Sequence, residues 1–275
     1  MAKLGLLAGS GDLPEKIIQA CLKQNKLIHV IAFHNQTPQS FIQNLPETIT
    51  HDWIHIGAVG EILKLLKHQG VTDIVFAGAM KRPSWSELKL DWVGLKWLKK
   101  IGWKSIQGDN GLLSSVVTLL ESEGFKIMHI SQILDNLLAP EGVLGKVQPT
   151  KEDWVDINRG IEVLKTLGPC DVGQSIIVQE GLVLGIEAIE GTEALIARCD
   201  LLRRSGKDGV LIKIAKPQQS RLVDLPTIGE STIKQALNLS GIAVQAEATQ
   251  ILNMIDTIEQ ANQAGIFIVG VKIES

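Results

Sequence analysis

The sequence has few cysteines and no long apolar run, and each shortage excludes a class of protein. Its three cysteines, Cys21, Cys170 and Cys199, are far apart and include no C-x-x-C pair, which argues against a zinc site and for a reducing compartment. No apolar stretch approaches the roughly 18 residues that a membrane-spanning helix needs. The first apolar run breaks at residues 9–12, which is not typical of a signal peptide. We therefore expect a cytoplasmic protein, or one lying peripherally on the cytoplasmic face of a membrane.

The sequence also lacks an excess of charge and several well-known catalytic motifs. A formal net charge of -3 gives no support for nucleic acid as a partner. There is no G-x-S-x-G element and no plausible Ser/His/Asp order, which disfavours acyl hydrolysis. The six histidines have no ligand-like spacing, so we interpret most of them as surface or core-edge residues and disfavour zinc catalysis. They are His29, His34, His51, His55, His68 and His129.

The length and composition of the chain indicate two globular domains. A chain of 275 residues is long for one ordinary core, and 45% hydrophobic with 21% charged residues is typical of a folded protein. The first third alternates short apolar runs with helical patterns, which indicates a parallel sheet with crossover helices. We predict an α/β protein with a Rossmann-like domain over residues 1–132 and a second α/β or α+β domain over residues 133–275. We expect the ligand in the cleft between them.

The elements of the first domain follow from its apolar patterns. Residues 4–8, 27–33, 74–77 and 125–130 are predicted strands. Pro14 opens a predicted helix over residues 14–24, since proline is favoured at the first helical position. A second helix has the apolar face Val59, Ile62, Leu63 and Leu66, and Gly70 ends it.

The second domain begins with a helix and a hairpin. Thr150-Lys-Glu-Asp153 resembles a capping box, and the helix that follows has the predicted apolar face Trp154, Ile157, Ile161 and Leu164. Strands over residues 175–178 and 182–188 flank a predicted hairpin turn at 179–181. A helix over residues 192–204, a strand over 210–214 and a strand–helix–strand series to residue 273 complete the domain.

A glycine-rich turn lies between the first predicted strand and the first predicted helix. In Gly9-Ser-Gly11-Asp-Leu-Pro14, glycines allow close approach of a diphosphate and the N–H groups of the helix start favour negative charge. From these residues alone, phosphate binding and a purely structural turn are equally good interpretations. A nicotinamide site is disfavoured because Pro14 replaces the third glycine, and the second strand ends in His34-Asn35 without a ribose-binding acid.

Two further segments of the first domain carry polar residues after predicted elements. Gly78-Ala-Met-Lys81-Arg82 follows a strand, so Lys81 and Arg82 are either phosphate ligands or solvated surface cations. Asp109 precedes a helical run, so it either caps that helix or faces the predicted cleft.

The segment from Arg221 to Gly229 presents a single carboxylate, Asp224, before a rigid turn. Pro226 favours extended backbone in the residue before it, and Gly229 permits a sharp reversal into the next helix. Asp224 is therefore a candidate metal ligand or general base, and equally a residue that caps the turn.

These motifs, with Asp171-Val-Gly173-Gln174 and Glu187-Ala-Ile-Glu190-Gly-Thr192, resemble the LpxI-type UDP-2,3-diacylglucosamine pyrophosphatases of lipid A synthesis. The resemblance runs from Leu4 to about Val271 and so covers nearly the whole chain. It departs from the family's pattern at residues 216–220, where Gln218 and Ser220 are replacements. The chain therefore departs from the family's pattern in this loop and keeps it at Asp224.

The resemblance implies hydrolysis of a lipid-linked nucleotide sugar, UDP-2,3-diacylglucosamine, to UMP and 2,3-diacylglucosamine 1-phosphate (lipid X). A diphosphate hydrolase needs a hard cation, Mg²⁺ or alternatively Mn²⁺, held by oxygen ligands. The alternatives left open are a Rossmann-type NAD(P) oxidoreductase and a non-catalytic nucleotide-sugar or lipid carrier. The implied catalytic residue is Asp224, and the implied metal ligands are Asp224, Asp171, Glu187 and Glu190. The implied substrate-binding residues are Gly9, Ser10, Gly11, Asp12, Leu13, Gly78, Lys81, Arg82, Asp109, Gln174, Gly191, Thr192, Lys213 and Lys216.

A tryptophan- and lysine-rich segment over residues 81–104 suggests a role in handling the acyl chains. It holds seven Lys or Arg residues and only two acids, Glu87 and Asp91. Tryptophan suits bilayer interfaces, and cations are attracted to anionic head groups, which predicts peripheral contact with the inner membrane. The competing interpretation is that these rings pack a domain interface or a homodimer contact. The helical stripe of this segment is Trp85, Leu88, Trp92 and Leu95.

Overall fold

The computed structural model describes residues 3–80, 89–101, 109–134, 137–217 and 225–273. The chain divides into two compact units, Met1–Asp135 and Asn136–Ser275. Each is an α/β domain with its own sheet, as the apolar patterns predicted. Among the described residues, no helix combines the length and apolar character needed to cross a bilayer.

The first domain is built on a five-stranded sheet in the order β3-β2-β1-β4-β5, and all its pairs are parallel. Its central strands are apolar runs buried along nearly their whole length, as expected where helices cover both faces of a sheet. The strands are β1 (Lys3–Ala8), β2 (Ile28–Phe33), β3 (Thr50–Ile54), β4 (Val71–Ala77) and β5 (Lys126–Ile127).

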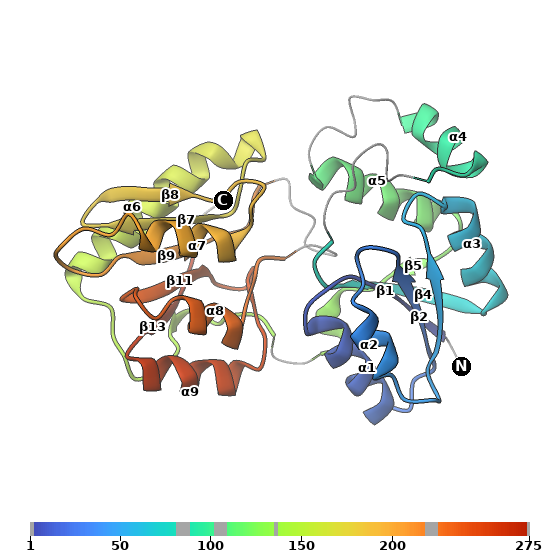
Figure 1. The fold of residues 1–275 in the computed structure, drawn as a ribbon, viewed down its shortest axis with the longest axis horizontal. Coiled ribbons are helices and arrows are strands. Elements are labelled where there is room, and N and C mark those ends of the chain that lie inside the picture. The colour runs from blue at the N-terminus through green and yellow to red at the C-terminus, as the bar shows by residue number, and fades with distance from the viewer. Residues whose placement is uncertain (1–2, 81–88, 102–108, 135–136, 218–224, 274–275) are drawn as a thin grey trace. The chain divides into compact units, whose positions relative to one another are not determined.

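Helices flank this sheet on both faces (Figure 1). Helices α1 and α2 lie on one side and α3 on the other, because the right-handed crossovers from β1 to β2 and from β2 to β3 run one way along the sheet, whereas the crossover from β3 to β4 runs the other way. The order of strands therefore reverses between β1 and β4, where sheets of this kind bind ligands at their carboxyl edge. The helices are α1 (Leu13–Lys23), α2 (Gln39–Gln43), α3 (Val59–His68), α4 (Trp92–Ile101) and α5 (Asp109–Ser122), with a 3₁₀ turn, η2 (Ile130–Gln132).

Three strands of this domain differ from the sequence prediction. The edge strand β3 was not expected, because its sequence Thr-His-Asp-Trp-Ile is largely polar and only Ile54 is buried. The fourth strand begins at Val71, three residues before the predicted start, and β5 ends at Ile127 instead of residue 130. The shortening of β5 is consistent with its place at the other edge of the sheet.

The second domain contains a six-stranded mixed sheet in the order β6-β13-β11-β9-β7-β8. Strands β9, β11 and β13 are parallel, and β7 runs antiparallel between β9 and β8. The predicted hairpin is present, with Glu180 and Gly181 at positive φ in its two-residue turn. The strands of the six-stranded sheet are β6 (Gly142–Val143), β7 (Ser175–Gln179), β8 (Leu182–Ile186), β9 (Val210–Lys213), β11 (Gly241–Gln245) and β13 (Phe267–Val271). A separate two-stranded sheet pairs β10 (Thr227–Ile228) with β12 (Gln250–Ile251).

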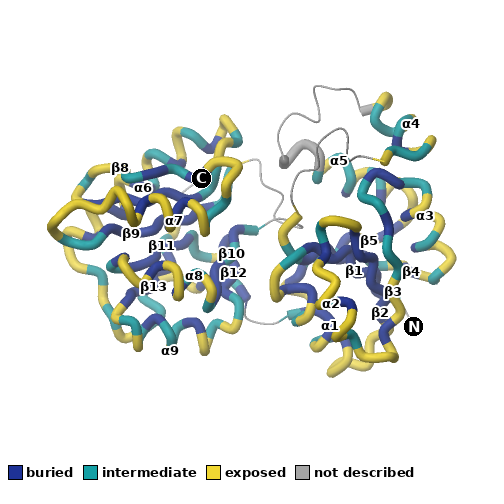
Figure 2. The backbone as a smooth tube through the Cα atoms, viewed as in Figure 1, coloured by how far each residue is buried: buried dark blue, intermediate teal, exposed yellow. Residues whose placement is uncertain are grey.

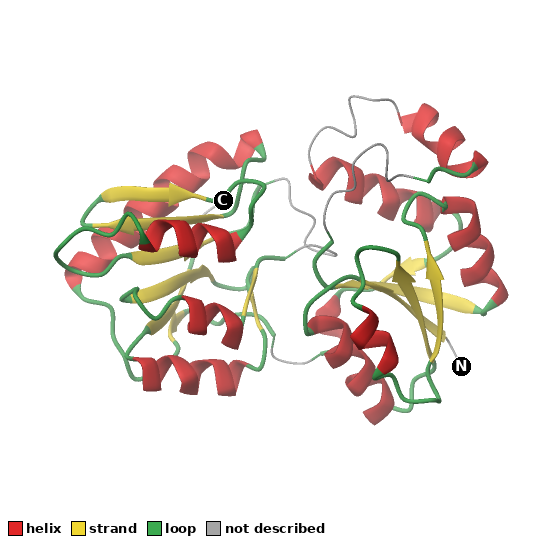
Figure 3. Cartoon of the chain, viewed as in Figure 1, coloured by secondary structure: helices red, strands yellow, loops and turns green. Residues whose placement is uncertain are grey.

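Alternate side chains of this sheet pack into two cores, one on each face. Ile176 and Ile212 lie in the core that includes Ile157 of α6. Ile177 and Leu211 lie in the core that includes residues of the helices on the other face. Figure 2 colours these central strands as buried, and Figure 3 marks the helices on either side of them. The helices are α6 (Lys151–Leu167), α7 (Thr192–Asp200), α8 (Glu230–Gln235) and α9 (Met254–Ala264), with a 3₁₀ turn, η3 (Gly168–Cys170).

Helix α6 confirms the predicted capping box and corrects its predicted face. Asp153 N donates to Thr150 Oγ1 at 3.3 Å, and Thr150 N donates to Asp153 Oδ2 at 2.7 Å. The predicted burial of Trp154 is wrong, since this residue is 36% exposed and Gly160 instead faces the sheet against Ile212. Helix α7 also ends at Asp200, four residues before the predicted end.

Candidate functional site

Two turns close the carboxyl edge of the first sheet, one after β1 and one after β4. Gly9 N donates to Ala77 O at 2.8 Å, and the backbones of Ser10 and Ala79 exchange two hydrogen bonds of 2.9 Å. A Cβ on Gly9 would lie 2.5 Å from Ala79 O, and one on Gly78 would lie 2.5 Å from Ser10 O. Glycine is therefore required at both positions, because any side chain would separate the two turns.

The turn after β1 leads directly into the start of α1. Within the described part of the chain, the structure gives no hydrogen-bond partner to the backbone N–H groups of Gly11, Asp12 and Leu13. Asp12 occupies the N-cap position without a side-chain capping bond. Open N–H groups at a helix start attract anions, so this turn is chemically suited to phosphate. Its predicted role in substrate binding stays a prediction.

In the second domain, Thr192 connects two buried charged side chains at one edge of the sheet. Thr192 Oγ1 donates to Glu187 Oε1 at 2.7 Å and accepts from Lys213 Nζ at 2.8 Å. Glu187 and Lys213 are 6% and 7% exposed. The antiparallel register that pairs Ser175 with Lys213 brings the ends of β8 and β9 to the same edge. Three of the predicted site residues therefore meet in one hydrogen-bonded cluster.

A second carboxylate–lysine pair involves the residues that flank this cluster in sequence. Lys216 Nζ lies 2.5 Å from Asp171 Oδ1, and both side chains are largely shielded from solvent. The backbone N–H of Gln174 donates to Glu187 Oε2 at 3.2 Å, which attaches the 171–174 loop to the Thr192 cluster. A Cβ on Gly173 would lie 2.0 Å from Glu187 O, so only glycine permits this approach. The predicted residues Asp171, Gln174 and Lys216 are thus assembled by short-range contacts.

Glu190 is paired with Arg198 in the turn before α7. Arg198 donates to Glu190 Oε1 from Nε at 3.1 Å and from Nη2 at 2.8 Å, and Ala188 N donates to Oε2 at 3.1 Å. The Arg198 hydrogen bond lowers the pKa of Glu190, with backbone hydrogen bonds adding to the effect. Gly191, with φ of 82°, is the N-cap of α7. This arrangement fits a structural role for Glu190, which anchors the turn before α7.

The described carboxylates do not form a magnesium site by themselves. No group of three or more His, Cys, Asp or Glu side chains suited to a metal ion occurs in the part of the chain that the structure describes. Asp171 and Glu190 are paired with a lysine and an arginine, so a cation of the chain already lies against each. Glu187 accepts hydrogen bonds at both oxygens. We therefore derive no catalytic step through a metal.

Several predicted site residues lie outside the described residues. They include Asp224, Lys81 and Arg82. For Asp109 the structure gives only its place as the first residue of α5. The described chain continues at Leu225, and Gly229 is the N-cap of α8, which agrees with the predicted reversal into a helix. The predicted roles of these residues, and of a ligand between the two domains, stay predictions.

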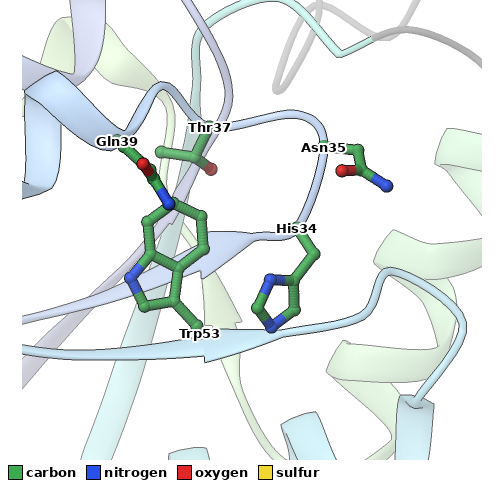
Figure 4. Close-up of a pocket in the computed structure, with 5 residues that line it drawn as sticks. All are labelled: His34, Asn35, Thr37, Gln39 and Trp53. Carbon is green, nitrogen blue, oxygen red and sulfur yellow. The ribbon is translucent and has the colours of Figure 1, made fainter.

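A cavity at the carboxyl edge of the first sheet was not predicted. Its volume is about 380 Å³, and its lining residues are His34, Asn35, Thr37, Gln39 and Trp53 (Figure 4). Four of them follow β2, and Trp53 comes from β3. The sequence pattern indicates that most histidines are surface or core-edge residues, and the largely polar sequence of β3 predicts no strand. No local motif marks a cavity whose walls come from two separate strands.

The folds define a two-domain α/β protein with a Rossmann-like first domain, whose turn after β1 is chemically suited to phosphate. The model of the LpxI N-terminal domain matches residues 3–137, and that of the LpxI C-terminal domain matches residues 140–269. The chain is 36% identical, over 279 residues, to the UDP-2,3-diacylglucosamine pyrophosphatase LpxI of Caulobacter vibrioides. The alignment covers 98% of each chain. The chain therefore belongs to the LpxI family.

Two solved structures are distantly similar to the chain. The CobK precorrin-6A reductase is 7% identical with a TM-score of 0.31, covering 100% of this chain and 91% of the other. The N5-carboxyaminoimidazole synthase of Aspergillus clavatus is 12% identical with a TM-score of 0.24, covering 74% and 44%. Similarities of this size carry no argument about function.

Proposed function

We propose that this protein hydrolyses the diphosphate of UDP-2,3-diacylglucosamine, giving UMP and 2,3-diacylglucosamine 1-phosphate, in lipid A biosynthesis. The observation that carries the proposal is 36% identity across 98% of both chains to the Caulobacter vibrioides pyrophosphatase. Matches to both domain models of the family extend the support to each half of the chain. The open N–H groups at the start of α1 agree with a substrate that contains a diphosphate.

The first domain is proposed to bind phosphate oxygens through the start of α1. The N–H groups of Gly11, Asp12 and Leu13 point from a helix start that is not capped by a side chain. The turns at Gly9 and Gly78 are hydrogen-bonded to each other, so the backbone donors that follow need no reorganisation when an anion binds. Donors fixed in this way bind an anion better than donors on a flexible loop do.

In the second domain, the proposed role of the Thr192 cluster is to orient charge. Lys213 supplies an ammonium group that offsets phosphate charge, and its hydrogen bond to Thr192 restricts where that group lies. Lys216 is paired with Asp171, so it offsets phosphate charge only where the substrate displaces that carboxylate. Glu187 fixes the orientation of the Thr192 hydroxyl. Asp224 is proposed either to accept the proton of the attacking water or to bind the cation, because hydrolysis of a diphosphate needs both a base and a cation.

Magnesium, with manganese as the alternative, is proposed as the cofactor on chemical grounds. A hard divalent cation offsets the charge of a diphosphate and lowers the barrier to attack by water. Asp224 is the metal ligand that we propose. Asp171 and Glu187, the other carboxylates of the motifs, could join it only by giving up their partners Lys216, Thr192 and the Gln174 N–H.

The proposal is tested by incubating the full-length protein with UDP-2,3-diacylglucosamine and Mg²⁺ and measuring UMP. We expect the Asp224→Ala variant to lose at least about 10²-fold in turnover, as when a group that stabilises the transition state is removed. Asp256→Ala, which removes an exposed carboxylate of α9, is the matched control. No UMP from folded wild-type protein would leave a carrier as the better interpretation, and bound NAD(P) would favour an oxidoreductase.

A further inference from the structure

Strand β9 diverges from its neighbour β11 close to where both strands end. Their parallel ladder stops at the pair of Lys213 and Val244. Beyond it, the β11 side turns to the next strand, since Ala246 N donates to Val271 O at 3.0 Å. Ala215, two residues beyond the ladder, donates its N–H to a side chain of β11 and not to the backbone of that strand. Parallel strands that separate at their carboxyl ends open the crevice in which α/β sheets bind ligands.

The side chain that spans this gap is the amide of Gln245, the last residue of β11. Its Oε1 accepts a hydrogen bond from Ala215 N at 2.9 Å. Gln245 is half-buried, and its own backbone is fixed by pairing with Val271 of β13. A shielded backbone N–H without an acceptor is costly, so the amide oxygen favours one position of the chain at Ala215.

The loop before β7 holds the same segment from its other side. Ile214, which is buried, donates its N–H to Gln174 O at 2.9 Å. Pro217 lies close to Gly168, where a Cβ would be 2.7 Å from Pro217 Cδ. The consecutive N–H groups of Ile214 and Ala215 therefore bond in opposite directions, because β9 lies between β7 and β11 in the sheet (Figure 1).

Lys216 directly follows this segment. Its Nζ lies 2.5 Å from Asp171 Oδ1, and the two side chains are 12% and 21% exposed. The lysine stem is long and flexible, so the place of its ammonium depends on where its backbone is fixed. Ile214 and Lys216 both bond to the loop over residues 171–174, whereas Gln245 belongs to a central strand. The Gln245 bond therefore fixes Lys216 relative to β11 and not only relative to a loop.

We propose that Gln245 is a positioning residue: through the N–H of Ala215, it fixes where the Lys216 ammonium lies when a phosphate group takes the place of Asp171. The inference rests on the proposed hydrolysis of UDP-2,3-diacylglucosamine, in which Lys216 offsets phosphate charge. Gln245 acts through the lysine and does not itself contact the substrate. Its contribution is to reduce the conformational freedom that a long side chain loses when an anion binds.

Steady-state kinetics with UDP-2,3-diacylglucosamine test this role. Gln245→Met keeps the length of the side chain and removes the acceptor. It should raise KM about tenfold and change kcat little, because the ammonium offsets the same charge in the ground and transition states. A variant that is merely less stable contains less folded enzyme, which lowers the apparent kcat and leaves KM unchanged. Gln245→Glu keeps an acceptor oxygen and should hold KM within about threefold of the wild type.

Gln179→Met is the matched control. Gln179 is the last residue of β7, and its amide also holds a loop, by bonds to Arg204 N at 3.0 Å and Lys207 O at 2.7 Å. It lies at the opposite edge of the same sheet, since β7 runs antiparallel to β9. Loss of this amide should lower the thermal stability and leave the KM of the folded fraction unchanged. A KM raised as much as in Gln245→Met would assign both effects to destabilisation and overturn the positioning role.

A double-mutant cycle identifies the residue through which Gln245 acts. Lys216→Met should raise KM about tenfold, and adding Gln245→Met should raise it no further, because no ammonium is left to position. Effects that multiply in the double variant would show that Gln245 acts independently of Lys216. That result, or a wild-type KM in Lys216→Met, would refute the proposal.

Calorimetric binding of inorganic pyrophosphate to the full-length protein separates this inference from the proposed function. Gln245→Met should weaken that binding about tenfold, and Gln179→Met should leave it unchanged. Pyrophosphate binding that depends on Gln245, without UMP release from the lipid substrate, would support the positioning role and overturn the hydrolysis. UMP release with a wild-type KM in Gln245→Met would overturn the positioning role and leave the hydrolysis intact. A folded wild type with neither UMP release nor pyrophosphate binding would overturn both.

Discussion

Thr192 Oγ1 donates a 2.7 Å hydrogen bond to the buried carboxylate of Glu187. The same oxygen accepts a 2.8 Å hydrogen bond from Lys213 Nζ, so one hydroxyl joins the loop after β8 to the end of β9. An isolated charge is costly to bury, and the hydroxyl supplies each of these two charged groups with a polar partner. The position of the Lys213 ammonium therefore depends on residue 192.

The first prediction is that the hydroxyl at residue 192 is needed for activity. Thr192→Val keeps the shape of the side chain but leaves Glu187 and Lys213 without this bridge. We expect a loss of at least tenfold in kcat/KM and a loss of about 1–3 kcal/mol in the free energy of unfolding. Thr192→Ser, which keeps the hydroxyl, should retain most activity. Wild-type kinetics in Thr192→Val would exclude a role for the bridge in orienting the Lys213 ammonium.

The second prediction concerns the proposed cation. Chelation with EDTA should abolish UMP release from UDP-2,3-diacylglucosamine, and added Mg²⁺ or Mn²⁺ should restore it, because a hard cation offsets the charge of the diphosphate. Thermal unfolding with and without the chelator provides the control, since a catalytic cation can be removed from a protein that stays folded. Full turnover in excess EDTA after dialysis would rule out magnesium dependence and leave charge neutralisation to the chain's own lysines.

The third prediction concerns which phosphorus atom is attacked. Hydrolysis in water enriched in heavy oxygen should place the label in 2,3-diacylglucosamine 1-phosphate, because we expect attack on the sugar-side phosphorus. Mass spectrometry of the two products measures this directly. Incubating each product separately in the same water is the control for later exchange. Label in UMP would assign the attack to the uridine-side phosphorus.

The fourth prediction is a loss of stability in acid through Asp153. Burial raises the pKa of this carboxyl, but hydrogen bonds from Thr150, Ser240 and Lys207 outweigh that effect and hold its pKa below the usual value. The folded state therefore binds this proton less readily than the unfolded state does. The ionised Asp153 carboxylate therefore contributes its full stabilisation above the usual Asp pKa of about 4, and this stabilisation is lost as the pH falls below that value through the lowered pKa of the folded state.

Urea unfolding between about pH 6 and pH 2 measures this effect. Asp153→Asn should be less stable than the wild type near pH 7 and should lose less stability over the acid range. Asp256→Asn, at an exposed site in α9, is the matched control and should follow the wild type. An acid profile of Asp153→Asn that parallels the wild type would assign the acid sensitivity to other groups.

Much of the first sheet could be predicted because its central strands are continuous apolar runs between turns. Strand β2 is buried at every position, so its sequence alone indicates a covered parallel strand. Strand β3 could not be predicted in this way, since His51, Asp52 and Trp53 do not form an apolar pattern. It pairs with β2 through its backbone, and that pairing depends on the rest of the sheet. The cavity at Trp53 was missed for the same reason.

The candidate site shows a similar division. Family motifs predicted Asp171, Glu187 and Thr192 as site residues, but they did not predict the contacts of these residues. Lys216 and Asp171 are 45 positions apart in the chain (216 minus 171). They meet because β7 and β9 pair in a register that places Ser175 opposite Lys213. The pairing of Glu190 with Arg198 depends on the geometry of the turn before α7. Residue type suggests a ligand, whereas only the fold shows that another side chain already pairs with it.

The fifth prediction is that α4 contacts anionic membranes. Trp92 is 70% exposed, and Lys96 Nζ lies 5.5 Å from its ring centroid. The helix packs against the loop at Gly57 through Gly94, where a Cβ would lie 2.8 Å from Gly57 O. Trp92, Lys99 and Lys100 are exposed and take no part in that contact. In the predicted stripe, Trp85 and Leu88 lie outside the described residues and Leu95 is half-buried.

An interfacial tryptophan among lysines favours anionic lipid, with each cation contributing about 1 kcal/mol near the surface. The protein should therefore sediment with vesicles containing anionic lipid at low salt and be released at high salt, because salt screens the attraction. Trp92→Ala should weaken the binding and leave the thermal stability unchanged, since its ring is mostly exposed. Trp154→Ala, on α6, is the control for loss of a tryptophan and should bind like the wild type.

Two results would contradict the membrane role and favour packing of this segment against protein. One is the absence of vesicle binding at low salt. The other is a marked loss of thermal stability in Trp92→Ala, because an exposed ring contributes to stability only when another surface covers it. Light scattering after gel filtration then distinguishes the cause: a dimer that Trp92→Ala converts to monomer would show that a second copy of the chain covers the ring.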